Sequence, residues 1–298
     1  MSKEIKKTTI GGQALYEGIL MKGPDQTSIV VRKPNGELEK KIIDRFEITN
    51  KYSIFKYPFF RGIGAFIDAI KNGTKAIDYS LSFSEEEEKK QSKLSEIFYS
   101  ILSFLIFAGF LLLFFYVPTW FSNLFKDKIS SVFVLNLIEG LVRIVFFLLY
   151  VIGIAQLKDI KRVFEYHGAE HKTIACYEYG EELTVENVRK HSKLHPRCGT
   201  SFMFNMVIIS AFVLAFFGWP NPIVRVITRI LIIPLLMGIT YELNRWMGKS
   251  DSFLAKILAK PGMFVQYIGT VKEPTDDMIE VAIEAMKMVI PEDNSDEW

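Results

Sequence analysis

Hydrophobic positions along the chain gather into four long blocks that polar segments separate. The blocks are Ile97–Val117, which stops at Pro118, then Val132–Ile154, Phe202–Trp219 and Ile223–Tyr241. A helix needs about 20 apolar residues to cross the hydrocarbon core of a bilayer. The pattern therefore predicts about four transmembrane helices, and the fourth is the weakest because it contains Arg225, Arg229 and Pro234.

The segment ahead of the blocks predicts a small unit of strands and one helix. Ile29–Arg32 and Leu38–Ile43 flank a Pro-Asn-Gly turn, which is typical of a β-hairpin. Apolar residues three or four apart from Phe59 to Phe83 predict an amphipathic helix. This helix packs on the protein core or lies along a membrane surface. The charged run Ser84–Lys93 is interpreted as a linker.

The central and C-terminal polar segments predict further short elements. A helix is expected to begin at Thr184 as N-cap and to stop at Pro196. In the tail, Met263–Thr270 favours an extended piece, and a helix is predicted from Thr275 to Val289 with acidic residues in its first turn.

Together these elements predict a fold class, namely a mainly α, polytopic membrane protein. About four transmembrane helices carry a small α+β cytosolic part, built from the N-terminal region, the central histidine-rich loop and the C-terminal tail. The expected units are residues 1–93 (hairpin, amphipathic helix and linker), 94–157 (the first two spans), 158–201 (the loop), 202–243 (the last two spans) and 244–298 (the tail).

Composition and charge sharpen this picture. The chain is 49% hydrophobic with a net charge of +2, so charge does not indicate a nucleic-acid partner. Residues 158–201 carry eight lysines and arginines, and the segments on the other side carry few. The positive-inside rule then places this loop and both termini in the cytosol of a multi-pass cell-membrane protein, although Arg225 and Arg229 argue mildly against it. No signal-peptide pattern opens the chain. In the reducing cytosol Cys176 and Cys198 should be free thiols.

All four histidines and both cysteines lie between residues 164 and 202. His167, Glu170 and His171 match the pattern H-x-x-E-H, in which two histidines bind zinc and the glutamate is a general base. On a helix, residues four apart share one face, so both imidazoles can reach one metal ion. Gly168 costs such a helix about 1 kcal/mol relative to alanine. The pattern predicts His167 and His171 as metal ligands and Glu170 as the catalytic base.

His191 and His195 repeat the spacing and are predicted as further metal ligands. Three protein ligands would leave a catalytic position open, four would suit a closed structural site, and two metals bridged by a carboxylate are a further alternative. Further candidate site residues are Cys198, which could be a thiolate ligand, and Glu17, Glu178 and Glu242, carboxylates that would complete the site or orient a ligand. The competing interpretation is a set of packed interfacial histidines. Cys176 favours a small buried side chain over a ligand.

Two other features of the sequence lie outside the histidine-rich segment. Glu139 and Arg143 are four apart inside the second block and predict an ion pair, structural or functional, while Asn205 predicts a contact between helices. The glycine-rich stretch "TIGGQALYEGILMKGP" lacks the G-K-[ST] of a nucleotide-phosphate loop and favours tight turns.

These stretches resemble the YqhQ-like family of bacterial membrane proteins. The resemblance rests on "GGQALYEGILMKGP", "HGAEHKTIACYE", "LTVENVRKHSKLHPRCGTSF" and "KEPTDDMIEVAIEAM", and it covers most of the chain. The family is described as uncharacterised or as a predicted metal-dependent enzyme, so the resemblance implies a metal and supplies no substrate. Tyr16 departs from the aliphatic residue expected at its position.

Three classes of function follow. The first is a metal-dependent membrane hydrolase, with zinc as the favoured divalent ion, acting on a membrane-proximal peptide or lipid-linked substrate. The alternative is a non-enzymatic membrane scaffold that recruits a protein partner and has a structural metal site. Transport is weaker, because four spans offer few walls unless the chain forms a homo-oligomer.

Overall fold

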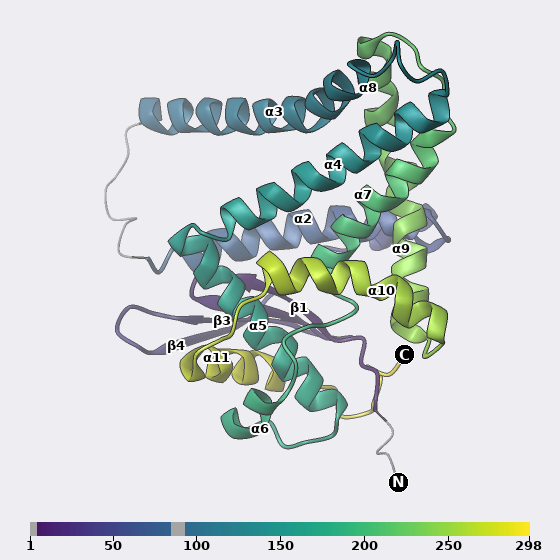
Figure 1. Cartoon of the computed structure of the whole chain (residues 1–298). Coiled ribbons are helices and arrows are strands. Elements are labelled where there is room, and N and C mark those ends of the chain that lie inside the picture. The colour runs from purple at the N-terminus through teal and green to yellow at the C-terminus, as the bar shows by residue number, and fades with distance from the viewer. Residues whose placement is uncertain (1–4, 85–92) are drawn as a thin grey trace.

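The computed structural model describes residues 5–84 and 93–298, and for several residues of its helix α3 it describes the backbone alone (Figure 1). The predicted linker, apart from its two end residues, lies outside the described residues. The elements, in chain order, are β1 Gly11–Leu15, β2 Gly18–Lys22, β3 Thr27–Arg32, β4 Leu38–Ile42, α1 Ile48–Lys51, η1 Ser53–Lys56, α2 Phe60–Leu81, α3 Lys93–Asn123, α4 Val132–Ile154, α5 Lys158–Glu178, α6 Val185–Lys190, α7 Gly199–Ala215, α8 Pro222–Leu231, α9 Ile233–Lys249, α10 Phe253–Val265, η3 Gln266–Thr270 and α11 Asp276–Lys287.

The strands form one antiparallel meander in the order β1-β2-β3-β4. The predicted hairpin is confirmed as β3 and β4, with Arg32 opposite Leu38. The glycine-rich stretch is not only a turn, because it supplies two more strands, and Leu15 pairs with Gly18 across their tight connection. Sequence reasoning missed this second hairpin, since glycine weakens a strand signal.

Both faces of the sheet are covered, which explains why β2 and β3 are almost continuously apolar. Ile19, Met21 and Val30 face a core that α5, α6 and α11 complete. The alternate positions Leu20 and Ile29 face Ala76 of α2. Successive strand residues point to opposite faces, so α2 and the α5–α11 pair sandwich the sheet between them (Figure 1). Helix α2 confirms the amphipathic helix predicted for Phe59–Phe83.

The remaining helices form a second, apolar layer above the sheet. Phe147 and Val151 of α4 pack against Phe204 and Val207 of α7, with Val265 of α10 in the same cluster. At Gly140 the two helix backbones come so close that a Cβ would overlap Ala211. Small residues that allow this approach are typical of helix pairs in membranes. The expected contact of Asn205 is also present, because its side chain donates to Asn244 of α9 at 2.9 Å.

The boundaries of the four apolar blocks are corrected in part. Helix α4 occupies the predicted range. Helix α3 runs through Pro118 instead of stopping there, and the Thr119 hydroxyl donates to the carbonyl of Phe115 at 2.9 Å. Side-chain hydroxyls of this kind help proline to be tolerated within apolar helices. Helix α7 ends early, at Ala215.

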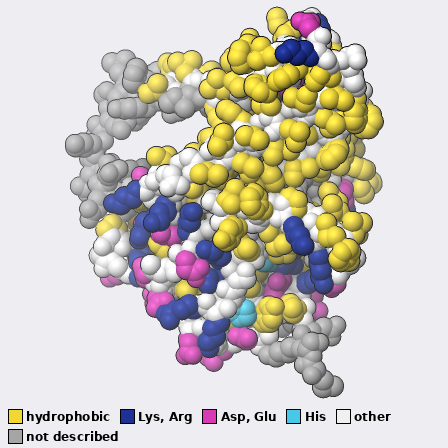
Figure 2. Space-filling view, in the orientation of Figure 1, with side chains coloured by type: hydrophobic (Ala, Val, Ile, Leu, Met, Phe, Trp, Pro, Cys, Tyr) yellow, Lys and Arg dark blue, Asp and Glu magenta, His cyan; other side chains and the backbone are white. Residues whose placement is uncertain are grey.

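The fourth block is two helices, α8 and α9, that meet at Ile232 with a bend of 45°. Pro234 lies in the first turn of α9, the helical position that proline tolerates best. Within residues 5–84 and 93–298, α4 is the helix that is long and apolar enough to cross a membrane, and α8 with α9 adds a second if the bent pair is one span. Figure 2 shows hydrophobic side chains dominating the surface of this layer, with charged side chains gathered over the sheet layer.

Two predictions for polar segments are wrong. Met263–Thr270 is helical: it contains the end of α10 and the π-helix η3. Thr184 is the N-cap of α6, as predicted, and its side chain accepts a hydrogen bond from the Asn187 amide. The helix ends at Lys190, however, and does not continue to Pro196. His191 and His195 therefore do not share a helix face. Helix α11 confirms the helix predicted from Thr275.

Candidate metal site

Helix α5 carries His167 and His171 on one face, as the spacing predicts, and their ring centroids lie 4.4 Å apart. Gly168 is what allows the helix to sit here. A Cβ at this position would come far closer to the Lys272 carbonyl oxygen than the 3.0 Å that Cβ atoms keep. The amide of Lys272 also donates to the Phe164 carbonyl at 2.9 Å. Glycine lowers the stability of α5 at this position, but it allows the chain after η3 to pack directly against the helix.

Cys198 is the third member of the cluster. It is buried and occupies the N-cap position of α7, and its Sγ lies 3.1 Å from His167 Nε2. One ring nitrogen of each histidine and this sulfur lie within 4.8 Å of one another. A tetrahedral zinc site holds its donor atoms roughly 3–4 Å apart. Small side-chain rotations would close the difference.

Backbone carbonyls orient both histidines. His167 Nδ1 donates to the Thr270 carbonyl at 2.9 Å, and His171 Nδ1 donates to the Lys193 carbonyl at 2.6 Å. A neutral imidazole with Nδ1 protonated keeps its lone pair on Nε2. Histidines that bind metals almost always donate their other ring N–H in this way. These two hydrogen bonds fix the orientation of both rings and leave Nε2 of each for other contacts.

The charges in the cluster depend on one another. Burial alone would raise the pKa of the Cys198 thiol, but the adjoining His167 and His171 hold it well below its ordinary value. Burial likewise opposes protonation of His167, yet the cysteine raises the pKa of that imidazole to about 9. The pair shares one proton. Metal ligation by sulfur uses the same thiolate form.

Glu170 lies beside the cluster but outside its tightest part. Its carboxylate is buried against the sheet, where a Cβ on Gly12 would lie 2.9 Å from the glutamate Cδ. One carboxylate oxygen accepts from the Gly12 backbone, and Oε2 has no hydrogen-bond partner. Burial raises the pKa of Glu170, while the two histidines oppose that rise. Glycine at position 12 is thus needed for a close approach, a role that the motif alone did not reveal.

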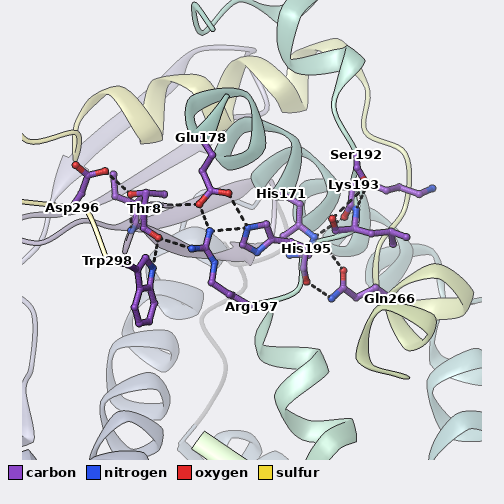
Figure 3. Close-up of polar contacts among 12 residues, drawn as sticks. Thr8, His171, Glu178, Ser192, Lys193, His195, Arg197, Gln266, Asp296 and Trp298 are labelled. Atoms are coloured by element: carbon purple, nitrogen blue, oxygen red, sulfur yellow. Dashed lines mark hydrogen bonds and ion pairs between the residues drawn. The ribbon is translucent and has the colours of Figure 1, made fainter. Parts of the chain in front are cut away.

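His195 reaches the cluster from the side, with its ring centroid 5.5 Å from that of His171. Its backbone amide donates to Gln266 Oε1 at 2.9 Å, and its Nε2 lies 3.2 Å from Arg197 Nη2 and 3.7 Å from Glu178 (Figure 3). Burial lowers the pKa of His195, so the ring is held neutral. The ring packs against the cluster.

Glu178 sits at the centre of a network that joins distant parts of the chain. It binds Arg197 and accepts from the Thr8 amide at 2.9 Å. Thr8 in turn donates to Asp296 at 2.5 Å, and its carbonyl accepts from the indole of Trp298 at 2.7 Å (Figure 3). Helix α5, the histidine loop and both terminal segments are thereby tied together next to the cluster.

The structure keeps three predicted residues away from the cluster. His191 caps the C-terminus of α6, lies 3.2 Å from Glu181 and packs on Tyr179; with Cys176 and Glu181 it forms a separate, partly exposed group. Glu17 turns between β1 and β2 and pairs with Arg162. Glu242 pairs with Arg61 at the start of α2. Cys176 and Cys198 are both free thiols, as expected.

Two cavities are lined by residues that adjoin members of the site. One, of about 280 Å³, is lined by Arg197 and Gly199, the neighbours of Cys198 in the chain. The other, of about 250 Å³, is lined by Gly12, whose backbone touches Glu170. Both are lined by Ala65 and Ala69 of α2. Helix α2 therefore lines both cavities.

Several groups that shape the site carried no sequence signal. The carbonyls of Thr270 and Lys193 act through the backbone, which any residue provides. Gln266 bridges both backbone groups of His195, and Arg197 links Glu178 to the Thr8 carbonyl. Only the position of Arg197 beside the histidine pair could have pointed to it.

Comparisons with known proteins give a family and no activity. Residues 57–292 match the family model described as "Protein of unknown function (DUF1385)". The chain is 36% identical over 310 residues to "Uncharacterized protein YqhQ" of Bacillus subtilis (strain 168), covering 97% of this chain and 95% of that protein. No solved structure matches it.

Proposed function

This chain belongs to the DUF1385 family, and we propose that it is a membrane hydrolase that depends on a divalent metal ion, with zinc favoured. His167, His171 and Cys198 would hold the ion, and Glu170 would serve as the general base. The observation that carries the proposal is the convergence of these three side chains, with both imidazoles oriented by backbone carbonyls.

The residues present fit such an ion. Two imidazoles and a thiolate are a donor set that zinc uses in catalytic sites with a fourth, open position. The buried Glu170 oxygen without a partner is the second supporting observation, because native proteins seldom leave such an atom unsatisfied. Glu170 lies outside the 4.8 Å group of donor atoms. That position suits a base better than a ligand.

When bound, the ion supplies Lewis acidity, which polarises a carbonyl or phosphoryl oxygen and lowers the pKa of water. The chain supplies the rest. Glu170 takes the proton from the attacking water and returns it to the leaving group. His195, held neutral, and the Arg197–Glu178 pair keep the loop that carries Cys198 in place. Burial of the cluster excludes bulk water and strengthens each of these interactions.

The membrane part of the proposal rests on the apolar layer. We infer a multi-pass protein of the cell membrane, with the sheet layer, both termini and the metal site in the cytosol. The exposed apolar side chains of α4, α7 and α8 support it, as does the lysine- and arginine-rich loop 158–201. The cavities beside the cluster lie where α2 separates the two layers. A membrane-proximal peptide or a lipid-linked substrate suits that position.

The alternative is a non-enzymatic scaffold whose metal is structural. The observation in its favour is the burial of Cys198 and His171, since structural sites are enclosed. It requires a fourth protein ligand, and His195 is the nearest candidate.

The test begins with the metal content of the full chain, purified in a mild detergent. Wild type, Cys176→Ser and His191→Ala should hold one equivalent of zinc, whereas Cys198→Ser and His167→Ala should hold almost none. Cys176→Ser removes a buried thiol that lies outside the cluster and so controls for thiol loss. Equal zinc in wild type and Cys198→Ser would refute the site.

Cobalt then separates an enzyme from a scaffold. The Co²⁺-loaded chain absorbs visible light, and the intensity reports the coordination number. Addition of acetohydroxamic acid, a small metal chelator, should change the spectrum if a position is open. Glu170→Gln should keep the metal and the spectrum but should fail to complement a strain from which the gene has been deleted. A spectrum that acetohydroxamic acid leaves unchanged would favour the structural site.

A further inference from the structure

A second polar cluster is buried within the apolar layer, on elements that do not contribute to the metal site. Glu139 of α4 binds Arg143 at 2.8 Å, which confirms the predicted ion pair. It also binds Arg229 of α8 at 2.7 Å, and Arg225 lies 3.8 Å away. The three arginines are at most 5% exposed. The sequence pattern indicated only the first of these pairs.

The cluster has too many positive charges for its one carboxylate. The remaining partners are neutral: Asn123 accepts from Arg225, Asn136 from Arg229, and Trp219 stacks on Arg225 with its ring 3.8 Å from the guanidinium. Among the described residues, no other carboxylate pairs with these arginines. Arginine stays protonated at any physiological pH. Three guanidinium groups and one carboxylate leave an excess of two positive charges.

The excess positive charge is accompanied by arginine donors that have no hydrogen-bond partner. Nε of all three arginines, and Nη1 of Arg225, are buried without a hydrogen-bond partner. A buried unpaired donor is unfavourable, and a buried unpaired charge more so. A second anion would satisfy both the donors and the charge.

Two hollows adjoin the cluster and differ in character. A cavity of about 60 Å³ is lined by Arg225, Thr228 and Arg229. A groove of about 500 Å³ runs between α3 and α8 and is lined almost entirely by apolar side chains, including Leu112, Phe115 and Ile227. Phe115 joins the groove to the arginine cluster, because the Arg143 guanidinium lies over its ring at 5.9 Å.

We propose that this region binds one anionic phospholipid, with its phosphate on Arg143, Arg225 and Arg229 and an acyl chain in the groove between α3 and α8. Arginine presents a planar fork of donors that matches phosphate oxygens. A free phosphate ion would use the arginines and leave the groove empty. The lipid uses both, and it is the occupant whose charge and apolar chain match the two surfaces.

The cluster extends inward from the start of two helices. Arg225 is in the first turn of α8, Glu139 is seven residues into α4, about 10 Å from its start, and Arg143 lies one turn further along. A phosphate would therefore approach the arginines from the end of the layer where α4 and α8 begin. This inference rests on the membrane placement in the proposed function and not on the metal.

The experiment compares lipids around the full chain. The protein is placed in nanodiscs of phosphatidylcholine or of phosphatidylcholine with increasing phosphatidylglycerol, with matched acyl chains, and its thermal unfolding is followed. Phosphatidylglycerol should raise the melting temperature in a saturable way. Inorganic phosphate added to phosphatidylcholine discs should not reproduce the effect.

Variants locate the effect. Arg225→Gln should raise the phosphatidylglycerol fraction at half effect about tenfold, as expected for loss of a charge-assisted contact. Ile227→Trp, which fills the groove without touching a charge, should weaken the effect as well and covers the case in which Arg225→Gln fails to fold. The control is the pair Lys126→Gln and Lys128→Gln, exposed cations near the start of α4, which should leave the half-effect fraction unchanged.

Each remaining outcome decides something. Equal melting temperatures in both lipids, or an effect that only the lysine pair removes, would overturn the lipid site and leave the membrane placement intact. Inorganic phosphate reproducing the shift would replace the lipid with a free anion. Failure of the chain to enter nanodiscs would overturn the membrane placement, which the metal analysis does not test.

Discussion

Gly168→Ala tests how tightly α5 is fitted against the chain after η3. The new Cβ would overlap the Lys272 carbonyl oxygen, a backbone atom that cannot rotate away. Overpacking of this kind costs about 1–3 kcal/mol, and a backbone overlap belongs at the upper end. Alanine recovers about 1 kcal/mol through its better helix propensity. The net loss of stability is about 2 kcal/mol, or roughly a thirtyfold fall in the folding equilibrium constant.

The substitution should also weaken the binding of the proposed metal ion. Lys272 follows the Thr270 carbonyl, which orients His167, by two residues. Displacement of this segment removes the hydrogen bond that fixes the imidazole, and loss of such an outer contact typically weakens metal binding 10–100-fold.

Thermal unfolding in detergent, together with zinc competition against a chromogenic chelator, measures both effects. Gly153→Ala is the matched control, because this glycine is also helical and has no atom within 4 Å of its Cβ position. The control should be neutral or slightly stabilised. If Gly168→Ala is as stable as Gly153→Ala and binds zinc equally well, the contact does not constrain α5 and the reasoning is wrong.

Three further predictions concern the framework. Glu178→Ala should lower stability by about 3–5 kcal/mol in chemical unfolding, because it leaves buried partners uncompensated, whereas the exposed Glu186→Ala should change it by less than about 0.5 kcal/mol. Burial would raise the pKa of Asp296, but its hydrogen bonds hold that pKa below the ordinary 3.8. The ionised carboxylate therefore contributes stability above pH 3.8, and this contribution is lost as the pH falls through the folded-state pKa. The difference in melting temperature between wild type and Asp296→Asn should shrink from about pH 6 downwards, and a constant difference would contradict this. Gly140→Leu should push α4 away from Ala211 of α7, because any Cβ at position 140 would overlap that residue. A lower melting temperature would support this contact, and an unchanged one would contradict it.

The sequence pattern predicted an element correctly where local apolar periodicity alone determined its structure. Helix α4 matches its predicted range because an apolar run of helical length covers it, and the structure adds Ser131 as its N-cap. The pair His167 and His171 was predicted because both lie within one long helix, where spacing determines the shared face.

Tertiary contacts decided the rest. The chain after Lys190 leaves the helix so that the Lys193 carbonyl can accept from His171, which separates His191 from His195. The aromatic and β-branched residues before Thr270 favour a strand locally, but Gln266 binds both backbone groups of His195 and η3 is helical instead. Cys198 could be suspected from its position beside the second histidine pair. Its partnership with His167 required the fold.

The network around Glu178 also sets an order of events during synthesis. Glu178 leaves the ribosome 118 residues before Asp296, and synthesis at about 5–20 residues per second makes this a delay of roughly 6–24 s. The histidines of α5 are made just before that interval and Cys198 is made early in it, while the link from Thr8 to the tail does not yet exist. The proposed metal ion would therefore have access to these ligands before the two ends of the chain are joined. The last residues would then close over a site that had already taken up its ion.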